Sequence, residues 1–196
     1  MRTLAQCPSD VEHFGAMGWR GSLQEAKGGV KLHVSSDRPF ALHLLDTNDL
    51  ITSGPRCDGV LVSETGRTGL TCFLELKGVI DPDKPDQPFD QIRGGIEHFA
   101  PTPEQSHGEE HHAVWRVGKD LPVAPRGRGK PKPIAISNEH DVAGAVIVMR
   151  AGTRHRPRWL NVAGREVFVA VIQKHGKWGQ VMLTMNEIEA SVGQRP

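Results

Sequence analysis

The stretch CFLELKG (residues 72–78) has the pattern of a buried strand, yet it carries Glu75 and Lys77 two positions apart. Burying either charge alone is costly. Because side chains alternate between the two faces of a strand, Phe73, Glu75 and Lys77 share one face. The other face is apolar and is expected to pack into the core. The charges are therefore expected to emerge side by side near the end of a strand that is otherwise a core element.

A second strand is predicted just before this one. CDGVLVS (57–63) reads as a strand, ETGRTG (64–69) as a hairpin turn and LTCFLELKG (70–78) as the returning strand. Asp58 and Glu75 lie at similar distances from the centre of the turn. The spacing therefore predicts that these two carboxylates lie nearly opposite each other across the hairpin.

Two carboxylates that close repel each other unless a cation lies between them. Mg²⁺ prefers oxygen ligands and commonly uses one or two carboxylates, leaving its other positions to water and substrate phosphate. A lysine beside such a metal orients or activates the attacking water and stabilises the charge that develops on the phosphate. Asp58, Glu75 and Lys77 are thus predicted to hold a metal and a water against a phosphodiester.

An Asp, followed on the adjoining strand by Glu-x-Lys and then by a helix, resembles the PD-(D/E)xK nuclease superfamily. The matching stretches are CDGVLV, FLELKG and FDQI, as in small bacterial members with a CD…ELKG…QI pattern. The resemblance covers roughly residues 40–99, with 142–149 as the next strand. It implies an α/β fold with a restriction-endonuclease-like core, a central mixed β-sheet flanked by helices in the order αβββαβ.

The resemblance also implies metal-dependent cleavage of DNA or, less often, RNA. It assigns Asp58 and Glu75 as ligands of Mg²⁺, for which Mn²⁺ substitutes, with the Leu76 carbonyl as a further ligand. It implies that Lys77 acts on the nucleophile and that Gln91 supports the site from the following helix. The setting that it suggests is restriction or phage defence, with a homodimer or a larger defence complex as the assembly.

The chain departs from the superfamily pattern at one position, and at another position it offers two candidate residues. Cys57 precedes Asp58 where many members have proline. Many members also carry a glutamate on the first helix, and both Glu12 and Glu25 are candidates for it.

The rest of the chain is interpreted as one domain spanning residues 1–196, with a loop-rich insertion at about 100–140 that holds six prolines. We expect a short helix over 9–19, capped by Ser9, and a second helical turn over 22–27. Helical spacing of apolar residues predicts a helix over 89–99, although two central glycines weaken it. Strands are predicted over 30–36, 40–46, 142–149 and 165–173, and residues 179–190 read as a strand or a helix.

Composition limits the class of protein. The 196 residues are 37% hydrophobic and 24% charged, as in globular proteins, and the net charge is only +1. Three cysteines without metal-like spacing favour a reducing compartment over a disulfide scaffold. The first residues lack the apolar region of a secretory signal, and no apolar run approaches the length of a membrane helix. We therefore expect a cytoplasmic protein that does not associate with membranes.

Charge is unevenly distributed along the chain. Residues 75–112 hold nine acids and three bases, and residues 113–165 hold eleven bases and three acids. This pattern suits a metal centre beside a polyanion, and equally two solvated faces that attract each other. The basic stretches are candidates for nucleic-acid contact, with DNA favoured over RNA; the residues are Arg126, Arg128, Lys130, Lys132, Arg154, Arg156 and Arg158.

Two further stretches leave alternatives open. Trp159, next to the second basic stretch, suits either stacking on a base or a place in the core. HGEEHH (107–112) offers zinc-ligand types, but its loop-like surroundings favour an exposed polar loop.

The sequence therefore favours a Mg²⁺-dependent endonuclease that hydrolyses phosphodiester bonds of DNA. The alternative is a catalytically silent protein with a nuclease fold that binds nucleic acid or acts as the scaffold subunit of a larger complex. The intact Asp58, Glu75 and Lys77 set argues against this alternative. A hydrolase of smaller phosphoesters is a third reading, and the basic stretches weigh against it.

Overall fold

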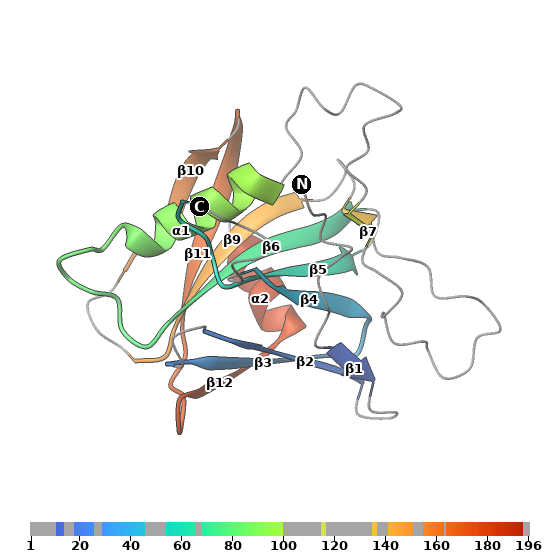
Figure 1. Cartoon of the computed structure of the whole chain (residues 1–196). Helices are drawn as coiled ribbons and strands as arrows, with labels where there is room; N and C mark the ends of the chain where they lie inside the picture. Colours follow the sequence, from blue (N-terminus) through green and yellow to red (C-terminus); the bar gives the residue numbers. More distant parts are fainter. Residues whose placement is uncertain are drawn as a thin grey trace.

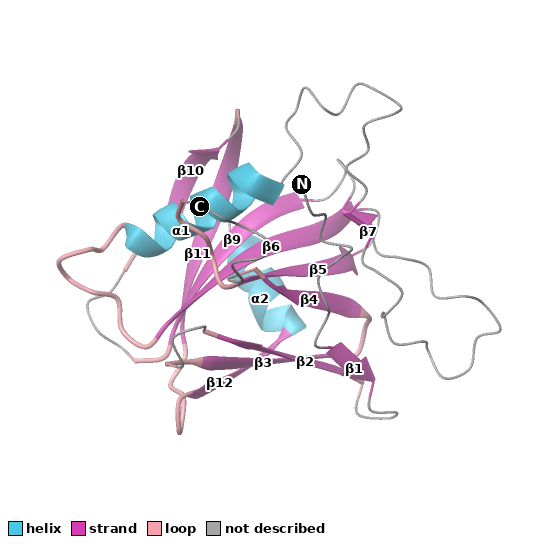
Figure 2. Ribbon diagram, viewed as in Figure 1, coloured by secondary structure: helices cyan, strands magenta, loops and turns pink. Residues whose placement is uncertain are grey.

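The fold is described from a computed structural model of the chain. It describes residues 11–13, 18–25, 29–45, 54–65, 68–99, 115–116, 135–136, 141–150, 155–162 and 164–193. Within these ranges the chain is a mixed α/β structure with two larger mixed sheets and two helices (Figures 1 and 2).

The larger sheet has six strands in the order β10-β11-β9-β6-β5-β4. Strands β4, β5 and β6 form an antiparallel meander, β9 pairs with β6 in parallel, β11 pairs with β9 in parallel, and β10 returns antiparallel at the edge. The strands are β4 (Phe40–Leu44), β5 (Gly59–Thr65), β6 (Thr68–Lys77), β9 (Asp141–Val148), β10 (Arg158–Val162) and β11 (Arg165–Gln173). The hairpin predicted from residues 57–78 is therefore present, with Thr65 paired to Thr68 around its turn.

The second sheet has four strands in the order β1-β2-β3-β12, with β12 parallel to β3. They are β1 (Val11–His13), β2 (Trp19–Gln24), β3 (Lys31–Ser36) and β12 (Gln180–Thr184). The helix expected over 9–19 and the helical turn expected over 22–27 are wrong where these residues are described. Residues 19–24 bury every second side chain, which is the period of a strand.

The core consists of three layers. Helix α1 (Gln87–Phe99) covers one face of the six-stranded sheet, and the four-stranded sheet with helix α2 (Met185–Gly193) covers the other (Figure 1). Phe73 packs under α1, whereas Leu74 belongs to the cluster between the sheets. Both faces of β6 are thus buried, which explains why its sequence is almost continuously apolar.

Helix α2 follows β12 directly, so residues 179–190, read as a strand or a helix, contain both. A reciprocal cap marks the change. The Glu187 backbone N–H donates to Thr184 Oγ1 over 3.2 Å, and the Thr184 backbone N–H donates to Glu187 Oε2 over 2.7 Å. This capping box satisfies two N–H groups at the start of the helix.

The expected loop-rich insertion lies mostly outside the described residues. Its described part is the short antiparallel pair of β7 (Trp115–Arg116) and β8 (Ala135–Ile136). The HGEEHH stretch also lies outside the described residues. In the part of the chain that is described, neither helix has the length and apolar character needed to span a membrane.

Candidate active site

The hairpin brings Asp58 and Glu75 together. The ladder between β5 and β6 ends with Gly59 opposite Leu74, so the next residues in register are Asp58 and Glu75. The Leu76 backbone N–H donates to Asp58 Oδ2 over 2.6 Å, which fixes the Asp58 carboxylate against the end of β6. Asp58 is only 4% exposed and Glu75 is fully buried. The juxtaposition predicted from the spacing is therefore present, and both carboxylates are withdrawn from water.

Lys77 lies between two glutamates that come from different sheets. Its Nζ is 2.6 Å from Glu75 Oε1 and 4.0 Å from Oε1 of Glu25, which follows β2. Of the two upstream candidates, Glu25 is therefore at the site. Glu12 is paired with Arg20 in the β1–β2 ladder, and its side chain is outside the described part of the chain.

The electrostatic balance of this cluster is unfavourable for a second negative charge. Burial, together with the neighbouring Asp58 charge, raises the pKa of Glu75 to about 8, despite the opposing effect of Lys77. Burial disfavours the Lys77 ammonium, but the attraction of Glu75 outweighs it and the pKa of Lys77 lies above its usual value. One lysine thus compensates two buried carboxylates only in part.

Helix α1 positions the segment that carries Asp58. A side chain at Gly94 would place its Cβ 2.0 Å from the Pro55 carbonyl oxygen, and one at Gly95 would place it 2.5 Å from Cys57 Sγ. The two glycines therefore let the chain before β5 lie directly on the helix. The sequence interpretation treated them only as a weakness of the helix, because the contact joins segments about 40 residues apart.

Gln91, predicted to support the site, ties the same segment to α1. Its Nε2 donates to the Arg56 carbonyl oxygen over 3.2 Å, two residues before Asp58. Gln91 thus acts on the position of the Asp58 segment through the backbone. A hollow of about 710 Å³ lies on this side of the segment, lined by Arg56, Gln91 and the loop before α1.

The residues present fit a divalent metal. Glu75 Oε2 is buried without a hydrogen-bond partner among the described residues, beside a second buried carboxylate. A bound divalent cation would relieve both the unsatisfied oxygen and the repulsion between the two charges. Asp58 and Glu75 are the side chains that would hold it, and the described residues contain no group of three or more His, Cys, Asp or Glu suited to a metal.

Of the residues predicted to contact nucleic acid, two are described. Arg156 is exposed. Arg158 forms an ion pair with Asp86, and its guanidinium lies over the Phe89 ring, 4.4 Å from the centroid. Arg158 therefore joins β10 to the start of α1. The others lie outside the described residues: Arg126, Arg128, Lys130, Lys132 and Arg154.

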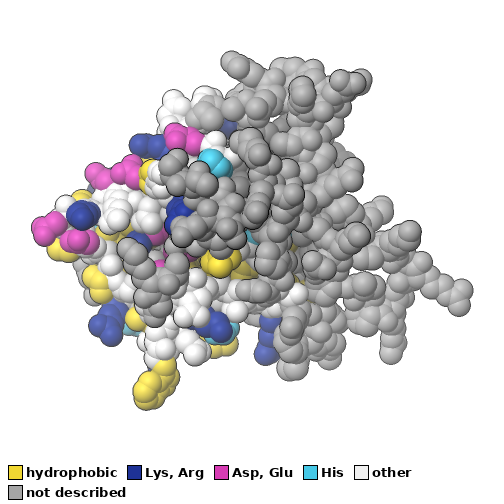
Figure 3. Space-filling model, viewed as in Figure 1, with side chains coloured by type: hydrophobic (Ala, Val, Ile, Leu, Met, Phe, Trp, Pro, Cys, Tyr) yellow, Lys and Arg dark blue, Asp and Glu magenta, His cyan; other side chains and the backbone are white. Residues whose placement is uncertain are grey.

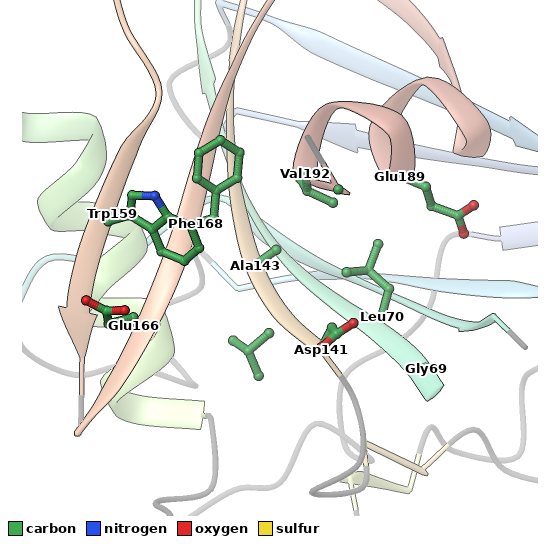
Figure 4. A pocket seen from close by; sticks show the side chains of 11 residues that line it. Gly69, Leu70, Asp141, Ala143, Trp159, Glu166, Phe168, Glu189 and Val192 are labelled. Carbon is green, nitrogen blue, oxygen red and sulfur yellow. The ribbon is translucent and has the colours of Figure 1, made fainter. Parts of the chain in front are cut away.

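Trp159 lies at the opposite end of the sheet, in a pocket of about 260 Å³ (Figure 4). Its ring packs against Phe168, with 5.2 Å between the centroids, and remains 44% exposed. The charged side chains that line this pocket are Asp141, Glu166 and Glu189. The contact with Phe168 therefore favours a packing role for Trp159 over stacking on a base.

The chain matches no family model, no curated protein and no solved structure in comparisons with known proteins.

Proposed function

We propose that this chain is a metal-dependent nuclease that hydrolyses phosphodiester bonds of DNA. The observation that carries the proposal is the pair of buried carboxylates, Asp58 and Glu75, with Lys77 beside them and one Glu75 oxygen left without a partner. Groups that cost stability to bury and have perturbed pKa values are typical of functional sites. Mg²⁺ bound there would neutralise charge on the phosphate and lower the pKa of an attacking water.

The order of elements supports the same proposal. Apart from the short β7–β8 pair between α1 and β9, strands β4, β5 and β6, helix α1 and strand β9 occur in the order of three strands, a helix and a strand. This order is consistent with the βββαβ part of the restriction-endonuclease-like core that the PD-(D/E)xK resemblance implies. The leading helix of that core has no counterpart among the described residues before β4, which form strands instead.

Each residue of the cluster has a distinct part in the proposal. Asp58 is held by the Leu76 N–H with its carboxylate against the end of β6, where a metal ligand is needed. Glu75 supplies the second carboxylate. Lys77, 19% exposed and the most accessible of the three, reaches the solvent side and is suited to orient a water and to stabilise charge on the phosphate. Glu25 holds the Lys77 ammonium from the second sheet.

The test is cleavage of supercoiled plasmid, linear duplex DNA, single-stranded DNA and RNA by the purified chain with Mg²⁺ or Mn²⁺. We expect cleavage of DNA that EDTA abolishes and that Glu75→Gln and Lys77→Ala remove while the circular dichroism spectrum is unchanged. Glu187→Gln is the matched control, since Glu187 also pairs with a lysine but lies on α2. Cleavage that survives in both site variants would contradict the proposal.

The catalytically silent alternative has its own outcome in the same experiment. If the protein cuts no substrate, isothermal titration with Mn²⁺ is measured for the native chain and for Glu75→Gln. Binding of metal and of DNA without turnover would favour a nucleic-acid-binding or scaffold subunit of a larger complex. Absence of both kinds of binding would rule out the nuclease and the scaffold readings together.

A further inference from the structure

The turn between β11 and β12 carries an exposed tryptophan, Trp178. The Gln180 backbone N–H donates to the Lys177 carbonyl over 2.9 Å, which closes a two-residue turn of Trp178 and Gly179. Both residues have positive φ, 56° and 75°, the pattern of a type I′ turn. Trp178 is 96% exposed. A type I′ turn favours asparagine or glycine at this position, so a bulky apolar residue there is costly and has no role in the core.

This turn starts at the same end of the strands of the six-stranded sheet as the candidate active site. Gln173, the last residue of β11, pairs with Val148, which pairs with Lys77 on β6. Two strand spacings separate Gln173 from Lys77, about 10 Å. The Lys174 backbone N–H then donates to the Val148 carbonyl over 3.0 Å and continues this register into the turn.

The base of the turn is packed against the chain that follows Lys77. A Cβ added at Gly176 would lie 2.8 Å from Met149 Cγ, so the turn touches Met149 closely. The Met149 backbone N–H in turn donates to the Lys77 carbonyl over 2.9 Å. The turn is therefore fixed to the strand that carries the candidate site.

The other side of the turn adjoins the segment that carries Glu25. The Lys31 backbone N–H donates to the Gly179 carbonyl over 2.8 Å, and the Glu25 N–H donates to the Val30 carbonyl over 2.9 Å. Glu25 is the glutamate that reaches Lys77 from the second sheet. The base of the turn that carries Trp178 is thus held on both sides by segments that lead to the site.

The turn and the segments packed against its base carry several basic side chains. Lys177 and His175 are exposed in the turn, and Arg150 is exposed just after β9. Lys31, at the start of β3, is half-buried. In the space-filling view a hydrophobic group protrudes where Figure 1 has this turn, with Lys and Arg side chains on the surface above it (Figure 3). An aromatic ring among cations suits a nucleic acid, whose bases stack and whose phosphates are negative.

We propose that the β11–β12 turn is a substrate-binding element, in which Trp178 stacks on an unpaired base of the nucleic acid and Lys177 contacts its backbone. This inference rests on the proposed function, because it takes the phosphodiester at Asp58, Glu75 and Lys77 as the other point of contact. The substrate class that it names is DNA with an unpaired base near the scissile bond, either single-stranded or at a duplex junction.

The experiment measures fluorescence anisotropy of a labelled single-stranded oligonucleotide and of the matching blunt duplex, with EDTA present to prevent cleavage. Trp178→Asn removes the ring and supplies a residue that suits the turn. Trp178→Phe keeps a ring. Met182→Ala is the control, because Met182 is also 73% exposed and lies on β12. Thermal unfolding of each variant verifies that the fold is kept.

We expect Trp178→Asn to weaken single-strand binding about 5- to 150-fold, as for loss of one stacked base. We expect Trp178→Phe to keep most of the affinity for the single strand and Met182→Ala to keep all of it. Binding of the blunt duplex should be weakened less by Trp178→Asn than binding of the single strand. Equal affinity of the native chain and Trp178→Asn for the single strand would overturn the inference. So would an equal loss in Met182→Ala.

Cleavage under Mg²⁺ separates this inference from the proposed function. If the native chain and Trp178→Asn bind and cut alike, the nuclease stands and the turn is not a substrate contact. If the native chain neither binds nor cuts any nucleic acid, both are wrong. If Trp178→Asn leaves nucleic-acid binding unchanged but converts the protein in solution from a dimer to a monomer, the turn is an interface between copies. That result would overturn the inference.

Discussion

Two glutamate–lysine pairs among the described residues, Lys174–Glu187 and Lys77–Glu75, differ in almost every respect. Lys174 and Glu187 are both about 40% exposed, and Glu187 also completes the capping box at the start of α2. Glu75 is fully buried beside Asp58, has an oxygen without a hydrogen-bond partner among the described residues, and has Lys77 as its compensating cation. The Lys174 interaction and the cap lower the pKa of Glu187, whereas burial raises that of Glu75.

The difference shows which pair the fold itself accounts for. A capping box stabilises a helix, so Glu187 is explained by α2 alone. A buried ion pair is weak evidence for stability, because removing the charges from water offsets their attraction. Glu75 and Asp58 therefore call for a reason outside the fold, and the bound cation of the proposed nuclease supplies one.

The largest effect is expected on catalysis. Lys77→Ala should lower the rate of DNA cleavage by about 100- to 10,000-fold, the range for loss of a group that orients or activates a nucleophile. Glu187→Gln, which removes the carboxylate charge of the exposed pair, should leave the rate unchanged. Single-turnover cleavage at saturating Mg²⁺ measures both. Equal rates in the two variants would mean that the buried pair is structural, as the exposed one is.

The two helices offer a second contrast, in their glycines. Gly94→Ala puts a methyl group onto the Pro55 carbonyl, and overpacking of this kind costs about 1–3 kcal/mol. Gly193→Ala, at the end of α2, meets nothing within 4 Å and should leave stability nearly unchanged. Urea unfolding measures the difference. Because the Pro55 segment leads to Asp58, we expect Gly94→Ala also to lose cleavage at temperatures where it is folded.

The sequence predicted the parts of the site that depend on local patterns. The spacing of Asp58 and Glu75 about a turn predicted their register, the helical spacing of apolar residues predicted α1, and a continuous apolar run predicted β9. These predictions succeed because a hairpin and an amphipathic helix are determined mostly by neighbouring residues. The role of Glu25 at Lys77 remained open, because it depends on how the second sheet lies against the first.

Long-range packing decided what the sequence did not predict. Ser9 indicated a capped helix, yet residues 11–13 and 19–24 pair as strands. The parallel partner of β3 is β12, almost 150 residues further along the chain. No local signal identifies such a partner, and the sheet it completes overrides helix propensity. For the same reason, the sequence did not predict that Gly94 and Gly95 allow α1 to lie directly against the chain before β5.

The pH dependence of stability should differ in sign between the two glutamates. The folded chain holds a proton on Glu75 up to a pKa of about 8, whereas the ordinary value is 4.5. Between these values the folded state binds more protons than the unfolded state, so the free energy of unfolding falls as pH rises. In EDTA we expect Glu75→Gln to remove this fall and to be more stable than the native chain at pH 8. Urea unfolding measures the free energy of unfolding of both proteins as a function of pH. If the two pH profiles are parallel, Glu75 is not in the buried position described.

The smallest effect concerns the exposed pair. Glu187→Ala should lower the free energy of unfolding at pH 7 by about 1 kcal/mol, as for loss of a helix cap. Because the pKa of Glu187 is lowered in the folded state, its contribution is present above the ordinary value of 4.5 and is lost as pH falls through the folded pKa. The variant and the native chain should therefore converge in acid. Glu187→Gln keeps an acceptor for the Thr184 N–H in its amide oxygen and should therefore retain part of the stability. If Glu187→Gln loses as much stability as Glu187→Ala, the effect belongs to the ion pair with Lys174 and not to the cap.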